Sequence, residues 1–202
     1  MQVIRPNNLI IKLIITSFFV NAGWGLITPI YAIFVTDEIA GGSLEVVGIA
    51  VGIFWLVKAV SQPFLAYKMD VVKGEHDDMV FLLRGTLIAT IIPLFYILSF
   101  DVWHIFILEA IRGFGFAMVQ PTLSGVFTRH VDKNWEAYAW GLQSASLGFA
   151  FGFSAIFGSM IASFLGFNTL FVIISFTSFI SLLVTYLAIR SDPWLKDGWE
   201  DD

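Results

Sequence analysis

Six long apolar blocks take up almost all of this 202-residue chain, and they constrain its fold more than any other feature. The blocks lie roughly at residues 9–35, 45–67, 81–100, 103–127, 138–164 and 168–189. A helix needs roughly 20 consecutive apolar residues to cross a bilayer. Only 13% of the residues are charged, which is too few to cover a globule in water. The pattern predicts one all-α domain of six transmembrane helices over residues 1–190, followed by an acidic cytoplasmic tail over 191–202.

The lysines and arginines lie on one side of these predicted spans. Nine of the eleven cations fall in the terminal segments, in the breaks after the second and fourth blocks, or at the adjoining helix ends. The three other breaks contain no Lys or Arg. Because cationic segments stay on the cytoplasmic side of a membrane, both termini are predicted to be cytoplasmic. We expect a multi-pass protein of the inner or plasma membrane.

Enzyme chemistry finds no support in the sequence. His76, His104 and His130 lie at or near the breaks, and no two have the spacing of metal ligands on one helix. Ser124 is followed by a glycine, but it lacks the Gly-x-Ser-x-Gly context of a nucleophile. There is no cysteine, and no basic nucleic-acid footprint. We expect no catalysis, cofactor, metal or nucleic-acid partner; the expected surroundings are the lipid bilayer.

Two cations, Arg112 and Lys58, lie deep within predicted spans. A charge at mid-bilayer costs at least about 2.5–3.5 kcal/mol on insertion scales, so such a residue usually faces a partner or a watery cavity. Glu109 precedes Arg112 by three residues and shares its helix face. Arg112 and Glu109 are therefore either a structural ion pair or part of a substrate cavity or proton-coupling site. Lys58 either faces the same cavity or extends its stem toward the surface.

Neutral polar side chains within the spans form a second group of candidates. On the first predicted helix, one broad face carries Asn21, Trp24, Thr28 and Tyr31. Gln120 and Gln143 add hydrogen-bonding groups in the fourth and fifth spans. Each is a candidate substrate contact, although such residues more often make hydrogen bonds between helices.

Glycines at four-residue spacing mark two of the spans. They are Gly48 and Gly52 in the second span and Gly148 and Gly152 in the fifth, with Gly158 further along. Such glycines are primarily packing devices, which let helices approach closely and slide. The correspondence between the two pairs favours a fold made of two inverted three-helix repeats, although chance matches are common in a glycine-rich membrane protein.

The break after the second block carries a more specific pattern. It resembles the signature loop of the major facilitator superfamily, in which a helix runs into Gly-x-Leu-Ala-Asp-Arg-x-Gly-Arg-Lys. Asp70 takes the place of the family Asp, Gly74 roughly that of its second Gly, and Lys68 lies nearby. Glu75 and His76 replace the family's basic pair, and one extra residue separates Asp from Gly.

A second resemblance to this family runs over residues 108 to 171. The sequence Leu108-x-x-x-Arg112-x-x-Gly115 looks like the fourth-helix motif, and the fifth-helix glycines follow in the family's order. Phe153 stands where drug/proton antiporters carry a proline, which argues against that subgroup. The resemblance implies a six-helix facilitator half, with a cavity lined by the first and fourth helices.

Asp70 is expected to act in a gating loop together with Gly74 and Lys68. Its carboxylate can accept hydrogen bonds from the free N–H groups at a helix start. We predict that it latches one six-helix unit to the fifth helix of a neighbouring unit. The alternative is a solvated loop acid.

Family members normally have two parallel six-helix halves, so this chain is expected to be a complete half-size protein. A lone half would leave cavity-facing polar groups against lipid, and twofold symmetry lets two identical chains supply both halves. We therefore predict a homodimeric secondary transporter working by alternating access. Two copies of Arg112, Lys58 and Glu109 give a positive cavity suited to an anionic or amphiphilic small molecule. The alternatives are a different six-helix partner, or a non-transporting scaffold or receptor.

Overall fold

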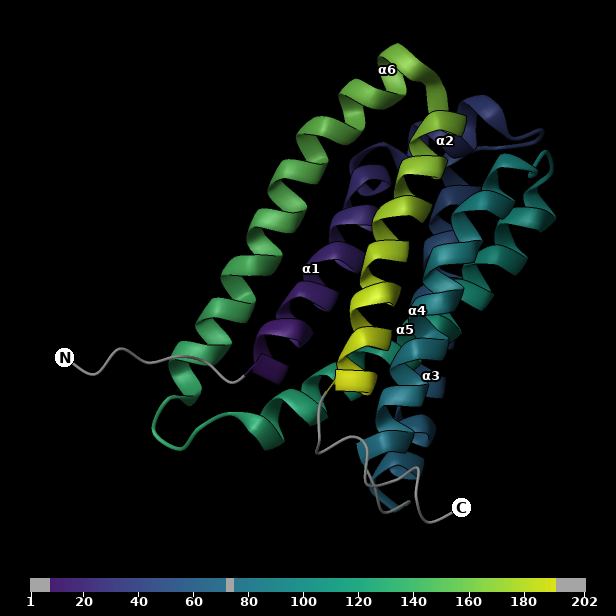
Figure 1. Cartoon of the computed structure of the whole chain (residues 1–202). Coiled ribbons are helices and arrows are strands. Elements are labelled where there is room, and N and C mark those ends of the chain that lie inside the picture. The colour runs from purple at the N-terminus through teal and green to yellow at the C-terminus, as the bar shows by residue number, and fades with distance from the viewer. Residues whose placement is uncertain (1–7, 72–74, 192–202) are drawn as a thin grey trace.

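The computed structural model describes residues 8–71 and 75–191 and shows a bundle of long helices (Figure 1). The helices are α1 (Asn8–Ile27), α2 (Tyr31–Glu38), α3 (Leu44–Val71), α4 (Glu75–Ile97), α5 (Val102–His130) and α6 (Glu136–Ser191). A short 3-10 turn, Thr28–Ile30, joins α1 to α2. Over the described residues there is no strand, only an isolated bridge between Ala40 and Asp101.

Proline and glycine explain the two interruptions of the bundle. Pro29 lies in the 3-10 turn, where its missing N–H prevents a regular helix, so Asn8–Glu38 forms one bent stretch. Gly166 has φ 79° and ψ 167°, a backbone conformation that favours glycine, and it lies inside α6. Figure 1 shows α6 folding back on itself, which gives a first arm over 136–165 and a second arm over 167–191.

Five of these stretches are long and apolar enough to cross a membrane: Asn8–Glu38, Leu44–Val71, Asp77–Ile97, Val102–His130 and Glu136–Arg190. The predicted all-helical membrane architecture is therefore confirmed. Six separate crossings and cytoplasmic termini stay predictions. The start of α1 and the end of α6 lie at the same end of the bundle (Figure 1).

Small polar residues join the helices of the bundle. Ser154 on the first arm of α6 donates to the Ala22 carbonyl of α1 at 2.7 Å. Ser181 on the second arm donates to the Thr16 carbonyl at 2.8 Å. Ser175 donates to the Thr90 carbonyl of α4 at 2.7 Å. Hydrogen bonds of this kind contribute to helix association in lipid. Here they join both arms of α6 to α1 and the second arm to α4.

The helices differ greatly in how much of them the chain itself covers. Of the apolar stretch of α3 that is long enough to span a membrane, 11% is buried, against 44% for α4 and α5. Large side chains of α3, among them Leu56 and Phe64, are exposed. The described part of the chain is therefore packed around α1 and α5, while α3 presents an open face.

Candidate functional site

An ion pair lies buried near the middle of α5. Nη2 of Arg112 is 2.6 Å from Oε2 of Glu109, one turn earlier on the same helix. The Glu109 side chain is fully buried and that of Arg112 is 14% exposed. Tyr96, on α4, donates its hydroxyl proton to Oε1 of Glu109 at 2.8 Å. Both carboxylate oxygens thus have a partner, which offsets the cost of removing the charge from water.

Aromatic rings enclose the guanidinium of Arg112. Its central carbon is 4.1 Å from the ring centre of Phe54, on α3, and 4.7 Å from that of Trp24, on α1. Phe116 packs edge-on against both rings. A cation over aromatic faces gains about 2 kcal/mol or more once it is desolvated. Helices α1, α3, α4 and α5 therefore all contribute to holding one buried charge.

Two glycines of α5 allow this convergence. A Cβ on Gly113 would lie 2.6 Å from the Phe54 carbonyl oxygen, so α3 approaches α5 backbone to backbone next to Arg112. A Cβ on Gly115 would lie 2.7 Å from the Ile88 side chain, on α4. These contacts bring the Phe54 ring and the Tyr96 hydroxyl within reach of the pair.

Several polar atoms around the pair lack a hydrogen bond. Over the described residues, Nε1 of Trp24, the hydroxyl of Tyr31 and Nε of Arg112 have no partner of standard geometry. Tyr31 is nonetheless close enough to Glu109 to interact with it electrostatically. Buried polar atoms are normally hydrogen-bonded, so Trp24 and Arg112 each retain an unused N–H donor within the described part of the chain.

Lys58 lies one turn after Phe54 on α3 and is half-buried. Its ammonium is 4.8 Å from the centre of the Trp55 ring, and it lies within electrostatic range of Arg112. A second positive charge therefore lies beside the ion pair.

The neutral polar candidates gather at a different level of the bundle. Nε2 of Gln143 donates to the Ser17 hydroxyl at 2.8 Å, and Asn21 donates to the Ser17 carbonyl at 2.8 Å. Gln120 joins Ser17 and Gln143 in lining a cavity of about 60 Å³. Gln120 follows Arg112 by eight residues, or about 12 Å along α5. Asn21 and Gln143 thus make local and interhelical hydrogen bonds, in a cluster apart from the ion pair.

The predicted gating and packing residues fall into three groups. Asp70 and Lys68 are exposed in the last turns of α3, and Gly74 lies outside the described residues. A Cβ on Gly48, Gly52, Gly148 or Gly152 would meet no described atom within 4 Å. On Gly158 it would lie 2.0 Å from the Leu26 carbonyl oxygen, so this glycine packs directly on α1.

Sequence reasoning missed several residues of the site. Tyr96 and Phe54 are part of it only through tertiary packing, because each lies on another helix than Arg112. A further ion pair, between the buried Asp78 of α4 and Arg129 near the end of α5, was also missed. The acid-rich start of α4 and the basic end of α5 were the available signals for that pair.

The fold and this buried charge define a multi-pass integral membrane protein. Residues 13–201 match the model of the Major Facilitator Superfamily, and the chain belongs to that family. The resemblance inferred from its motifs is confirmed. A search of the curated proteins found no match.

Among solved structures, the chain is similar to the in meso crystal structure of the POT family transporter PepTSo. The TM-score is 0.72 at 16% sequence identity, and the match covers 93% of this chain. It covers 38% of the other chain, so this protein spans well under half the length of that transporter. At this identity the likeness shows the fold.

Proposed function

We propose that this chain is one half of a secondary transporter of a small molecule, and that two identical copies assemble into the working unit. Membership of the Major Facilitator Superfamily supports a transport role. The observation that carries the proposal is the buried Arg112–Glu109 pair with its aromatic enclosure. A membrane-embedded ion pair with unused donors beside it is costly to keep, and such groups usually mark a substrate or ion pathway.

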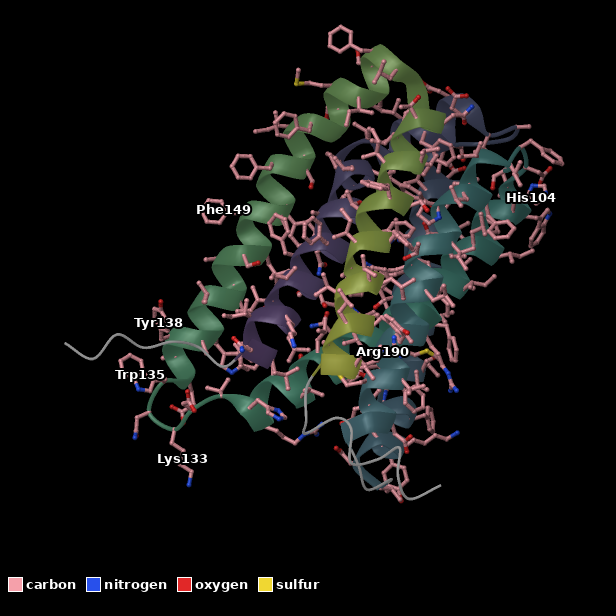
Figure 2. The ribbon with its side chains drawn as sticks, in the orientation of Figure 1. His104, Lys133, Trp135, Tyr138, Phe149 and Arg190 are labelled. Carbon is pink, nitrogen blue, oxygen red and sulfur yellow. The ribbon has the colours of Figure 1, made fainter. Side chains whose placement is uncertain are left out.

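Assembly of two copies is supported by the open face of the chain. The glycines of α3 and of the first arm of α6 that meet no described atom are those a neighbouring helix could approach most closely. Phe149 points outward from the first arm, away from the other helices (Figure 2). We infer that a second copy packs here about a twofold axis along the membrane normal. In alternating access, the two copies then rock against each other around a site near the midplane.

The substrate class follows from the charge near the site. Arg112 is balanced by Glu109, whereas Lys58 has no carboxylate partner among the described residues, so each copy contributes one net positive charge. In a low-dielectric site such a charge favours an anion. We infer an anionic or amphiphilic small molecule, with Trp24, Tyr31 and Lys58 among its contacts and the pair as the group that couples to protons.

Gating in this proposal depends on Asp70. Its carboxylate is exposed in the last turn of α3 and has no partner among the described residues, so it is free to accept from the helix start of a second copy. Asp70→Asn, which removes the charge at nearly constant volume, should then shift the population of inward-closed protein.

A non-transporting scaffold or receptor with the same half fold is the second candidate. Glu75 and His76 stand where the family carries a basic pair, which favours a chain that has lost the transport cycle. A half that pairs with a different six-helix partner is the third.

Transport by purified protein in liposomes tests the proposal. A mixed panel of anionic, cationic and neutral solutes is offered under an inward proton gradient, and uptake is followed by mass spectrometry of the liposome contents. We expect uptake of an anionic solute that is abolished in Arg112→Gln, reduced in Arg112→Lys, and unchanged in the exposed-loop control Lys133→Gln. Absence of uptake across the panel, in protein that is folded and dimeric, would favour the scaffold.

A further inference from the structure

A groove runs between α4 and the second arm of α6, and none of its lining residues belongs to the ion-pair site. Its volume is about 340 Å³, within the range of small-molecule sites. Its exposed wall is entirely apolar. The residues that line it are Leu83, Arg84 and Leu87 of α4, and Phe179, Leu182, Leu183 and Tyr186 of α6.

Two arginines border this groove, Arg84 as a lining residue and Arg190 through its contact with Tyr186. Arg84 lines the groove with its aliphatic stem, is exposed, and has no hydrogen bond or ion pair among the described residues. Arg190, in the last turn of α6, is exposed and holds its guanidinium 5.6 Å from the centre of the Tyr186 ring. Because Tyr186 belongs to the groove, both cations border its wall.

The register of the two helices places both arginines on the same side of one interhelical contact. The hydrogen bond from Ser175 to Thr90 fixes α4 against α6, and from there the two segments run toward the same end of the bundle. Along the axis, Arg84 lies about 9 Å from that contact, Tyr186 about 16 Å and Arg190 about 22 Å, at 1.5 Å per residue. The Arg190 guanidinium reaches back to the Tyr186 ring, and the long stem of Arg84 can extend toward the level of that ring.

We propose that this groove binds an anionic phospholipid, with an acyl chain along the apolar wall and the phosphate between Arg84 and Arg190. The large wall residues Leu87, Phe179 and Leu183 are exposed, so an acyl chain can reach the groove from the bilayer. Neither cation has a carboxylate partner among the described residues, so both complement the negative headgroup, and basic pockets between transmembrane helices commonly hold such groups. The inference is independent of the transport proposal, since no residue of the ion-pair site takes part.

Lipid retention measured by native mass spectrometry tests this site. Purified protein is incubated with phosphatidylglycerol or with phosphatidylcholine of identical acyl chains, and the bound lipid is counted. We expect phosphatidylglycerol to be retained in preference to phosphatidylcholine. Arg84→Gln and Arg190→Gln should each weaken phosphatidylglycerol retention about fivefold, because a basic residue near a lipid surface contributes about that much. Arg84→Lys should keep most of the binding, which separates loss of charge from misfolding.

The matched control is Lys133→Gln, which removes one positive charge at the same end of the bundle but on its far side from Arg190 (Figure 2). It should leave retention unchanged. Leu183→Trp, which fills the groove, should lower retention of both lipids. Equal retention of the two lipids by the wild type, or unchanged retention in the Arg84→Gln/Arg190→Gln double variant, would overturn the proposal. Displacement of the lipid by millimolar inorganic phosphate would indicate a simple anion site and would overturn it as well.

Discussion

The two glycines of α5 that flank Phe114 lie against neighbouring helices, whereas the glycine pairs of α3 and of the first arm of α6 face open space. The same residue type therefore marks two different surfaces. Around α5 the contacts are made within the chain, and they enclose a buried ion pair. At the glycine pairs of α3 and of the first arm of α6, the described residues supply no neighbour. The difference indicates that the helix surface around α5 is packed within the chain, whereas the glycine surfaces of α3 and of the first arm of α6 are open to a further partner.

The largest effect on stability is expected at the buried ion pair of α5. Glu109→Ala leaves Arg112 buried without its carboxylate, which should lower the free energy of unfolding by about 3–5 kcal/mol. Thermal unfolding in detergent micelles measures the change. Asp132→Ala, which removes an exposed loop acid, is the control. If both variants melted at the same temperature, the ion pair would not stabilise the packed region around α5.

A smaller effect is expected at the hydrogen bond to that carboxylate. Tyr96→Phe removes the donor to Glu109 while keeping the ring, and should cost about 1.5–3 kcal/mol, the range for hydrogen bonds to charged groups. Tyr138→Phe, at an exposed tyrosine at the start of α6, should be close to neutral in the same unfolding assay. A neutral Tyr96→Phe would show that Arg112 alone satisfies the carboxylate.

Alanine at two glycines compares the two surfaces directly. Gly113→Ala forces a Cβ against the Phe54 carbonyl and should destabilise the protein by about 1–3 kcal/mol, as overpacking does. Gly48→Ala adds the same atom where no described atom lies within 4 Å, and should be neutral or slightly stabilising because alanine favours helix. Equal destabilisation by the two variants would erase the distinction between the surfaces.

The smallest effect on the stability of a single chain is expected from a larger side chain at the open glycine surfaces of α3 and α6. Gly152→Leu should change the stability of an isolated chain by no more than about 0.5 kcal/mol, as a surface substitution does. If a second copy packs there, the same variant should lower the fraction of dimer measured by size-exclusion chromatography with light scattering. If the dimer tolerated leucine at both Gly48 and Gly152, its interface would lie on another surface of the chain.

The helical membrane architecture was predictable because it depends on block length and apolar content, which are local properties of the sequence. The proximity of Glu109 to Arg112 follows from three-residue spacing on one helix, and the structure joins them. Tyr96 was not predictable as their partner, because it lies on another helix and no local pattern sets the register between two helices. Four-residue glycine spacing likewise indicates close approach, but it does not say which neighbour approaches.

The same limit explains the neutral polar residues. Asn21 and Tyr31 were grouped on one helix face, yet Asn21 bonds back to Ser17 while Tyr31 is buried in the aromatic core. The 3-10 turn at Pro29 lies between them and changes the direction in which the following residues point. A uniform helical period does not capture that change.

The central claim is that a second copy packs on the open glycine surfaces of α3 and α6. Its most direct test is the mass of the wild-type protein released intact from lipid nanodiscs. Native mass spectrometry should give twice the mass of one chain, in a complex that survives dilution. A persistent monomer in lipids that keep the protein folded would contradict the account, because the open faces of α3 and α6 would then lie against lipid.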